Sequence, residues 1–526
     1  MTPNEKLHIL LITFMLIFSI TNISGCISQN NEGKAKAPTR NSITIGISEP
    51  VHGFHPYIHS YDVVTMMVNM NIFNSLVEFD QILRTKPKLA TSWNNPDDYT
   101  WRFYLRENVK FHNGYNFTSE DVKFTLEYIK NNESNVLRNL LNPVKEIKIV
   151  NKHTVDIITE RPCPILLNKL IDIPIASKKY VEENNIDWPI GTGAYKLTEY
   201  RPDEYIKLEK NDYYWEDLEV KNVTFKVTCG EEEMKNLTIS RELDIACHIL
   251  PKYYDEVSNC SGVRVGLCNQ ATVFYLGFDF RENNSVGYKD QKNPLSDVKV
   301  RKAIYHAINI TELIDNVLNG SNFAEPASQF VSPMIFGYNP NIERLPYDIE
   351  SAKQLLKEAG FKDGFELVLD IPKDAENQKN VAYLIQNQLS GLIDVKINLI
   401  SIEEWYMKIC QRNTSCYILG WLASSGDGGE VFDYILRTVD DKSGIGTYNV
   451  GYYSNKEVDR IGENISYILD PEDRLDLMQD GFQIAIDDVA WVPLYVPKHT
   501  YALAEDIAWD PGPGMLISVE DIGFKQ

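Results

Sequence analysis

The stretch that most constrains the fold runs from Leu89 to Ile129, LATSWNNPDDYTWRFYLRENVKFHNGYNFTSEDVKFTLEYI. Its first half predicts a half-buried strand, because Trp101, Phe103 and Leu105 are apolar and alternate with more polar residues. An alternation of period two places every second side chain on the same face of a sheet. The pattern therefore predicts one apolar sheet face at this position.

A tight turn and a capped helix complete the stretch. Residues 112–114 (HNG) predict the turn, since Gly114 can adopt positive φ without steric cost. Thr118 can accept a hydrogen bond from the backbone near Asp121, which is a common way for a helix to begin. One apolar helix face is then predicted from Val122, Leu126 and Ile129.

The amino end predicts export and a lipid anchor. Residues 9–20 (ILLITFMLIFSI) are fewer than the roughly 20 apolar residues that span a bilayer, but they have the length of a signal-peptide core. Residues 23–26 (ISGC) look like a lipobox, in which small residues precede a cysteine that is lipidated after cleavage. We expect a signal peptide over 1–25 and a polar tether over 26–41, anchored to the cytoplasmic membrane through Cys26. A short anchor helix with an incidental cysteine is the alternative.

Size and charge narrow the possible functions. About 485 residues follow the tether, which suits two or three domains better than one core. The net charge of −22, without a basic run, argues against nucleic-acid binding because phosphates would be repelled. This acidity fits either a solvated acidic surface or the steering of cationic ligands.

Cysteines and sequons also fit an exported protein. An exported protein can form disulfides, although their connectivity does not follow from sequence. The cysteines available for them are Cys163, Cys229, Cys247, Cys260, Cys268, Cys410 and Cys416. No CxxC motif occurs, so we expect no zinc ribbon. Asn-x-Ser/Thr sequons, typical of an exported surface, begin at Asn116, Asn132, Asn222, Asn236, Asn259, Asn283, Asn309, Asn413 and Asn464.

Helices and strands alternate in the second half of the chain. A helix is predicted over 350–359 (ESAKQLLKEA) and ends at Gly360, where a C-cap is expected. A strand over 365–369, a helix over 377–392 and a strand over 395–400 follow. Such alternation predicts an α/β architecture.

The opening stretch also resembles a signature of extracytoplasmic solute-binding proteins of the peptide/nickel class (bacterial solute-binding protein family 5), which deliver ligands to ABC importers. That family shows LA-x-x-W, then F-x-LR-x-x-V-x-FH-x-G, then an acidic dipeptide that opens a helix. The residues that match are Leu89, Ala90, Trp93, Leu105, Arg106, Val109, Phe111, His112, Gly114, Glu120, Asp121 and Val122. Stretches similar to the family also begin at Gly191 (GTGAY), Asn211 (NDYYW), Asp297 and Trp491, so the resemblance covers nearly the whole mature chain.

This resemblance implies a two-lobed periplasmic-binding-protein-like fold (class II, cluster C type), with a hinge and an interlobe cleft. Lobe I would comprise residues 42–60, 185–270 and 488–526. A subdomain over 61–184 would be inserted in lobe I, and lobe II would comprise 271–487. The implied partners are an ABC permease and ATPase complex, with the protein itself a monomer that needs no cofactor.

The richest candidate ligand site is residues 420–434, GWLASSGDGGEVFDY. Trp421 would offer a flat apolar platform, and Ser424, Ser425 and Asp427 would offer polar contacts. A packed tryptophan beside an ordinary turn is the alternative. The resemblance implies W-x-x-D here, and in peptide binders that aspartate holds the ligand's α-ammonium. This chain has Ser424 at that place, so either Asp427 reaches the amine or the ligand lacks one.

Four further residues are weaker candidates for contacting a ligand. Ser48 and Glu49 follow the first strand predicted for lobe I, so we expect them to face the cleft. Arg412 and Lys373 lie near strands predicted for lobe II and could pair with a ligand carboxylate.

Three histidines form a possible metal site. His52, His55 and His59 are spaced so that their imidazoles could meet a nickel ion. Pro56 interrupts any helix that would align them, so we expect surface or structural histidines and no bound metal.

No catalytic motif accompanies these features. GxSxG, HExxH and GxxxxGK[ST] are all absent, and we expect no enzymatic activity. The expected function is that of a lipid-anchored substrate-binding protein of an ABC importer that captures short peptides. A nickel chelate or an oligosaccharide is the alternative ligand, since relatives bind both. An exported hydrolase or a structural surface protein is the alternative from a different class.

Overall fold

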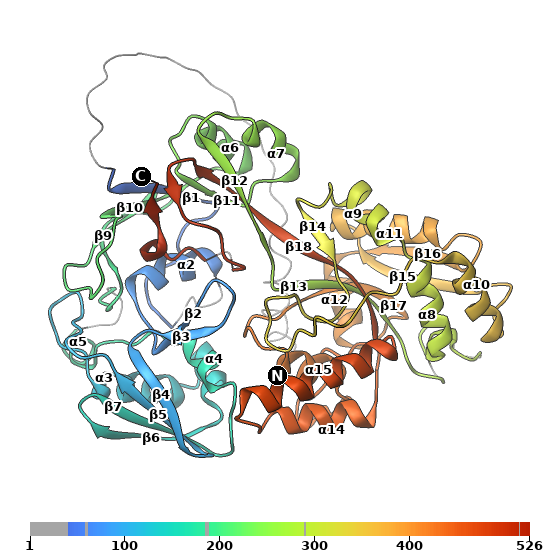
Figure 1. The fold of residues 1–526 in the computed structure, drawn as a ribbon, viewed down its shortest axis with the longest axis horizontal. Coiled ribbons are helices and arrows are strands. Elements are labelled where there is room, and N and C mark those ends of the chain that lie inside the picture. Colours follow the sequence, from blue (N-terminus) through green and yellow to red (C-terminus); the bar gives the residue numbers. More distant parts are fainter. Residues whose placement is uncertain are drawn as a thin grey trace. The chain divides into compact units, whose positions relative to one another are not determined.

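The chain folds into two compact units, each built of strands and helices (Figure 1). The first unit contains residues 40–268 and 499–525, and the second unit contains residues 269–498. The computed structural model describes residues 40–57, 62–184, 189–283, 285–288, 291–514 and 516–525. Helices and strands mix in both units, so the predicted α/β fold class is confirmed. The predicted division into lobe I, lobe II and an inserted subdomain stays a prediction.

The main sheet of the first unit has the strand order β8-β9-β10-β1-β11, and the last part of β18 pairs with β11. Strand β1 is parallel to both of its neighbours, whereas the other pairs are antiparallel. The strands are β1 (Ser42–Ile47), β8 (Tyr195–Arg201), β9 (Tyr205–Lys210), β10 (Asn222–Val227), β11 (Ile245–Cys247), β12 (Val263–Asn269) and β18 (Trp491–Ala504). The helices nearest to them in sequence are α2 (Val63–Ile72), α6 (Glu231–Ile239) and α7 (Pro251–Ser258).

A separate antiparallel sheet, ordered β4-β5-β7-β6, contains the strand predicted from the opening stretch. Trp101, Phe103 and Leu105 lie on β5 and all three are buried, as their alternation predicts. Helix α3 begins with the expected capping box, in which the Thr118 hydroxyl accepts from the Glu120 N–H and Asp121 accepts from the Thr118 N–H. The elements are β4 (Ala90–Asp97), β5 (Thr100–Leu105), α3 (Ser119–Asn131), η1 (Val136–Leu141), β6 (Val144–Asn151) and β7 (Thr154–Thr159). Shorter elements nearby are β2 (Val77–Phe79), β3 (Thr85–Pro87), α4 (Leu166–Ile171) and α5 (Lys178–Glu183).

His112 links two of the motifs that resemble the family. Its Nε2 lies 3.2 Å from the carbonyl oxygen of Gly193, and its Nδ1 lies 3.4 Å from the amide nitrogen of Gly191. Burial lowers the pKa of His112 to about 4, so the ring is neutral at physiological pH. A neutral imidazole can donate from one nitrogen and accept at the other, which suits these two contacts. His112 of the opening stretch therefore connects that stretch to residues 191–193 through hydrogen bonds.

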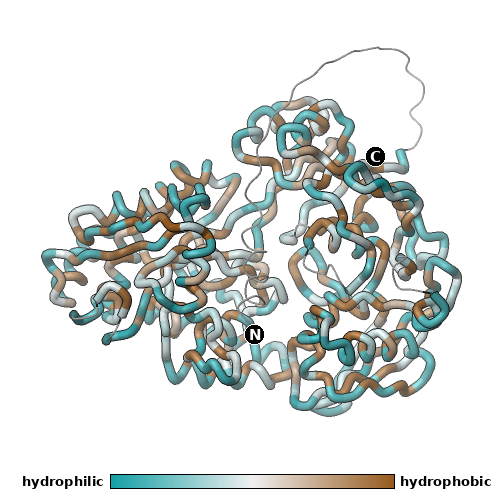
Figure 2. Tube along the Cα trace, turned by 180° about the vertical axis from the view of Figure 1, so that it is seen from behind, coloured by the Kyte–Doolittle hydropathy of each residue, from teal (hydrophilic) through white to brown (hydrophobic). Residues whose placement is uncertain are grey.

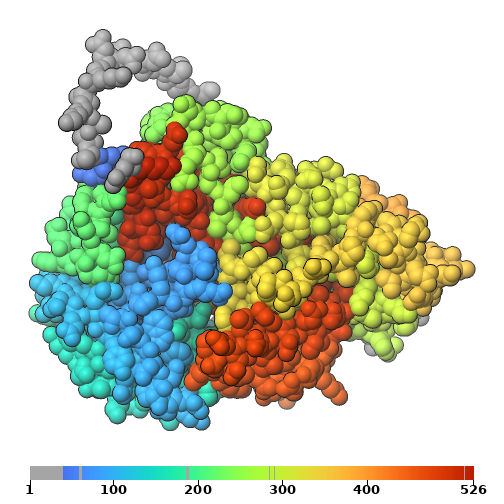
Figure 3. Space-filling model, in the orientation of Figure 1, coloured from blue at the N-terminus to red at the C-terminus, as the bar shows by residue number. Residues whose placement is uncertain are grey.

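The C-terminal segment completes the first unit. Lys88 is almost fully buried between the carboxylates of Glu78 (2.9 Å) and Glu520, and Glu520 also accepts from the hydroxyl of Tyr214. Strands β19 (Ile507–Ala508) and β20 (Gly523–Phe524) pair with each other beyond β18. In Figure 3 the C-terminal segment (red) lies against the surface of residues 195–265 (green). The C-terminal segment is thus held to residues 78–88, which are distant in sequence, by buried charges.

The sheet of the second unit has the strand order β16-β15-β17-β13-β18. Strand β15 is parallel to both neighbours, β13 is antiparallel to both of its own, and β14 adds to β18. The strands are β13 (Thr272–Phe278), β14 (Ala324–Pro326), β15 (Glu366–Pro372), β16 (Asp394–Ile400) and β17 (Cys416–Leu422). The longer helices are α8 (Val298–Ala307), α9 (Ile310–Val317), α10 (Ile349–Glu358), α11 (Glu376–Gln388), α12 (Ile402–Cys410), α14 (Lys456–Ile465) and α15 (Pro471–Asp487).

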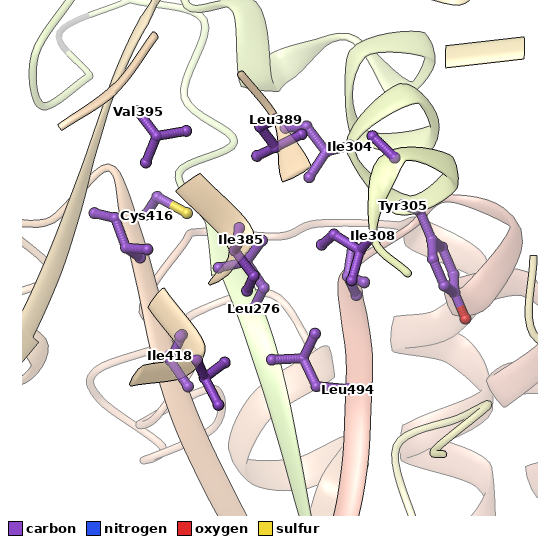
Figure 4. Packing of buried hydrophobic residues seen from close by; sticks show 14 of the residues in the cluster. Leu276, Ile304, Tyr305, Ile308, Ile385, Leu389, Val395, Cys416, Ile418 and Leu494 are labelled. Carbon is purple, nitrogen blue, oxygen red and sulfur yellow. The ribbon is translucent and has the colours of Figure 1, made fainter. Parts of the chain in front are cut away.

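Apolar side chains from both sheet and helices form the core of the second unit (Figure 4). Leu276 of β13, Ile418 of β17 and Leu494 of β18 contribute from the sheet. Ile304 and Ile385 contribute from α8 and α11. In Figure 2 the apolar stretches (brown) follow such inner elements in each unit, whereas polar residues (teal) predominate in outer loops. This core supports the end of β17, where the candidate site begins.

The export features predicted from the amino end lie outside the described residues, and this holds for residues 1–25 and for Cys26. None of the helices in the part of the chain that the structure describes is both long and apolar enough to cross a membrane. The signal peptide and the lipid anchor stay predictions.

Candidate functional site

The loop that follows β17 is held in place by a neighbouring segment. Trp421, near the end of β17, pairs with Val273 of β13. Phe336 donates from its N–H to the carbonyl of Gly426 (3.0 Å) and accepts from the N–H of Gly428 (2.7 Å). Gly426 has a φ of +69°, a backbone conformation that glycine adopts without strain. The backbone of residues 423–428 is therefore fixed rather than loosely extended.

Asp427 lies within this loop in a buried ion pair with Arg474 of α15. Arg474 donates from Nη2 to Oδ1 (2.7 Å) and from Nη1 to Oδ2 (2.5 Å), and both side chains are 6% exposed. Oδ1 also accepts from the N–H of Gly429 (2.8 Å). A Cβ at Gly429 would lie 2.7 Å from Nη2 of Arg474, so glycine leaves the room that the pair requires. The structure thus gives Asp427 a bidentate protein partner, and its contact with a ligand stays a prediction.

Three aromatic rings form the apolar part of the site, and we call them the aromatic trio: Trp421, Tyr434 and Tyr448. The centroid of Trp421 lies 5.5 Å from that of Tyr448 and 5.9 Å from that of Tyr434. Tyr434 is 43% exposed, Trp421 is half-buried and Tyr448 is buried. Tyr434 belongs to η3 (Phe432–Leu436), a π-helical turn, which is a feature often found at functional sites. The aromatic trio offers π-faces on which an apolar or cationic group can rest.

Glu430, in the short α13 (Gly429–Val431), places a carboxylate beside the aromatic trio. Its Oε2 accepts from the Ser425 hydroxyl (2.6 Å), whereas its Oε1 is buried and accepts no hydrogen bond of standard geometry. The indole Nε1 of Trp421 is also buried outside standard hydrogen-bond geometry, but it interacts with the Glu430 carboxylate closely enough to lower the pKa of Glu430. Burial, with a smaller effect of the nearby Asp427 charge, raises the pKa of Glu430 to about 7, against the lowering effect of the hydrogen bonds from Ser425 and Trp421. A ligand that donates a well-aligned hydrogen bond to this buried carboxylate would therefore be favoured.

The remaining predicted residues are distributed over both units. Ser424 is exposed next to Ser425, so these two share the loop with Trp421. Arg412 is buried, with Nη2 3.1 Å from Oδ1 of Asp441. Lys373 is exposed directly after β15. In the first unit, Ser48 and Glu49 are exposed directly after β1. Only Trp421, Ser424, Ser425 and Asp427 are thus neighbours in one loop, and whether any of these residues contacts a ligand stays a prediction.

The predicted histidines do not converge as far as the structure describes them. His52 lies 3.8 Å from Asp62, and the Nδ1 of His55 accepts from the N–H of Tyr57. His59 falls outside the described residues. Among the residues that are described, no group of three or more potential ligands could hold a metal ion.

Sequence reasoning missed Glu430, Tyr434 and Tyr448. Glu430 and Tyr434 lie inside the segment 420–434 that was singled out, and Glu430 is its second acid after Asp427. A helical turn after the glycines, if expected from the sequence, would have indicated that Glu430 lies near Trp421. Tyr448 and Arg474 carry no local signal, because they reach the loop only through the tertiary fold.

A family profile for bacterial extracellular solute-binding proteins, family 5 Middle, matches residues 84–443, which is more than half of the chain. The chain is 23% identical over 481 residues to the glutathione-binding protein GsiB of Salmonella typhi, covering 88% of this chain and 91% of that one. It is 26% identical over 430 residues to the dipeptide-binding protein of Escherichia coli, covering 74% and 78%.

Solved structures show the same fold. The structure of HbpA2 from Haemophilus parasuis matches with a TM-score of 0.82 at 20% identity, covering 92% of this chain and all of that one. Such a likeness at low identity concerns the fold, which is that of the periplasmic binding proteins expected from the sequence. With the profile match, it leads to one conclusion: the chain belongs to the bacterial extracellular solute-binding proteins of family 5.

Proposed function

We propose that this protein captures short peptides for an ABC importer and binds their amino-terminal ammonium group at Glu430 and the aromatic trio. The observation that carries the proposal is the buried carboxylate of Glu430, whose Oε1 accepts no hydrogen bond of standard geometry and which lies beside the aromatic trio, where Tyr434 is exposed. The dipeptide-binding relative supports peptides as the ligand class. Ser424 and Ser425 would supply further hydrogen bonds, and Asp427 would fix the loop through Arg474.

The chemistry of the site suits an ammonium group. A charge-assisted hydrogen bond to a carboxylate is roughly twice as strong as a neutral one. A cation over an aromatic face gains a further ~0.5–2 kcal/mol. Glu430 and the aromatic trio belong to the same unit, so both contributions can act on one ligand group. An uncharged sugar would gain stacking on the aromatic trio but nothing from the carboxylate charge.

Calorimetry with di- to hexapeptides tests the proposal. A peptide with a free amino terminus should bind, and the same peptide N-acetylated should bind at least tenfold more weakly, because acetylation removes the cation. Nickel–histidine and cello-oligomers are the comparison ligands. Binding of either of these without binding of any peptide would assign the protein to the corresponding alternative class, and turnover of peptides or esters would favour a hydrolase.

The variant Trp421→Ala should weaken peptide binding by about 30-fold, because a central aromatic anchor contributes on the order of 2 kcal/mol. Tyr383→Ala is the matched control, since Tyr383 is an aromatic residue on α11 of the same unit and is as exposed as Tyr434 of the aromatic trio (43%). Its affinity should stay at the wild-type value. Equal affinity of the wild type and Trp421→Ala would remove the aromatic trio from the binding site.

Peptide affinity should also depend on pH through Glu430. With a pKa of about 7, its carboxylate is mostly ionised at pH 8 and mostly protonated at pH 5.5, so affinity for a cation falls as pH falls, by up to about 30-fold. Glu430→Gln should lower the affinity at pH 8 by about 10–100-fold and abolish this pH dependence. The control variant Glu457→Gln, which changes an exposed glutamate of α14, should retain both the affinity at pH 8 and its pH dependence. A pH profile that survives in Glu430→Gln would contradict the assignment.

We further propose that the mature protein begins at Cys26, is lipidated there and is held at the outer face of the cytoplasmic membrane by the tether 26–41. The lipobox-like residues 23–26 support this, as does the family, whose members are extracytoplasmic. We also propose that the protein closes around the ligand by a hinge motion of lobe I, with its insert over 61–184, and lobe II. The wild type should sediment with membranes and Cys26→Ser should not; equal sedimentation of both would exclude the lipid anchor.

A further inference from the structure

The Asn-x-Ser/Thr sequons are more numerous than composition explains. From residue 42 onward the chain has ten of them, including one at Asn319. The reversed pattern Ser/Thr-x-Asn uses the same residues and occurs twice, at Ser92 and Thr447. Residue composition predicts equal numbers for the two orders. The chain therefore has an excess of the order Asn-x-Ser/Thr, which is the order that N-glycosylation requires.

The structure separates the sequon asparagines from the others by burial. Of the ten, eight are exposed, and Asn309 and Asn464 are half-buried. In the described part of the chain the buried asparagines are Asn69, Asn71, Asn74, Asn211, Asn293, Asn339 and Asn449. None of these begins a sequon. A glycan needs an exposed asparagine, so the burial pattern agrees with the order bias.

Structural roles of asparagine account for only a few of the ten. Asn309 is the N-cap of α9, and Asn259 donates from its own Nδ2 to the carbonyl of Asp255 (2.7 Å). Asn236 lies on the exposed face of α6, and Asn413 is exposed after α12, where its N–H donates to the carbonyl of Lys408 (2.8 Å). Neither of these two side chains caps a helix, so capping, which involves Asn132, Asn259 and Asn309, does not explain the sequons at Asn236 and Asn413.

Asn132 has the most suitable geometry. It is exposed at the C-terminal end of α3, and its Oδ1 accepts from the N–H of Ser134 (3.1 Å). This Asx-turn brings the asparagine next to the hydroxyl-bearing residue of its own sequon. No described residue accepts a hydrogen bond from Nδ2, the atom to which a glycan is attached.

We propose that this protein carries N-linked glycans at its exposed sequons, and in particular at Asn132. Nδ2 of Asn132 would attack the anomeric carbon of an oligosaccharide linked to a lipid phosphate carrier. The new bond is C–N, the bond from the anomeric carbon to the carrier oxygen breaks, Nδ2 loses one proton and the carrier phosphate leaves. The inference rests on the extracytoplasmic location of the family and is independent of which ligand the protein binds.

Peptide mass spectrometry of the protein purified from its native cells tests the proposal. The peptide that contains Asn131 and Asn132 should carry the mass of sugar residues, and fragmentation should place them on Asn132. An unmodified peptide would overturn the proposal.

Variants expressed in the same cells define the attachment site. Asn132→Gln and Ser134→Ala should lose the sugar mass from this peptide, whereas Ser134→Thr should retain it. Asn131→Gln is the matched control, because Asn131 is also exposed and begins no sequon, and it should retain the mass. Sugar mass retained in Ser134→Ala would show that the modification does not follow the sequon and would also overturn the proposal.

Discussion

Replacement of Arg474 by methionine should lower the free energy of unfolding of the second unit by about 3–5 kcal/mol. The guanidinium makes two hydrogen bonds to Asp427 and a third to the carbonyl of Ile465 (2.8 Å), all of them out of contact with solvent. Methionine preserves much of the volume but leaves the Asp427 carboxylate buried without its counter-charge. Urea unfolding followed by tryptophan fluorescence measures the change.

Arg460→Met is the matched control. Arg460 lies on α14 in the same unit and pairs with Glu457, but both side chains are at least half exposed, so the loss should stay below about 1 kcal/mol. The double variant Asp427→Asn/Arg474→Met should be more stable than the sum of its single changes predicts, because no lone charge remains. A cost for Arg474→Met as small as that of the control would mean that the ion pair does not stabilise the unit, and would favour a ligand-binding role for Asp427.

The variant Gly193→Ala should destabilise the first unit by about 3 kcal/mol or more. A Cβ at this position would lie 2.4 Å from the carbonyl carbon of Ile72 and 2.5 Å from the carbonyl oxygen of Asn71. These atoms belong to the backbone at the end of α2 and cannot rotate away as a side-chain tip can. The carbonyl of Ile72 also accepts from the N–H of Gly193 (2.9 Å), so separation of the two segments would break this bond.

Gly512→Ala provides the comparison, since in the described part of the chain no heavy atom other than those of its chain neighbours lies within 4 Å of its Cβ position. Its effect should stay within about 0.5 kcal/mol. Thermal unfolding of both variants and the wild type measures the difference. Wild-type stability of Gly193→Ala would mean that the loop does not pack against α2 as closely as described.

The sequence predicted those parts of the fold that local patterns determine. Strand β5 and helix α3 follow from alternation, a cap and an apolar stripe within about 30 residues, and all three signals act between near neighbours. Helix α10 ends where Gly360 adopts a φ of +89°, as a C-terminal glycine predicts. Such features need no knowledge of the tertiary fold.

The candidate site was predicted less completely, because tertiary packing brings its residues together. Trp421 and Ser425 could be nominated from a glycine-rich segment after a strand. That Asp427 pairs with Arg474, 47 residues later, depends on how α15 packs against the loop. The position of the Glu430 carboxylate beside Trp421 likewise depends on the turn formed by α13 and η3. Periodicity carries no information about such pairings.

The course of β18 has a consequence for biosynthesis. Its residues 491–495 pair with β13 in the second unit, whereas 501–503 pair with β11 in the first. A nascent chain that has reached residue 498 therefore contains every residue of the second unit but lacks the strand and the Glu520 contact that complete the first. The part translated earliest is the last to acquire all its partners, which reverses the usual order in which domains mature as they emerge. Until then, β11 presents an unpaired edge that must be kept from other strands.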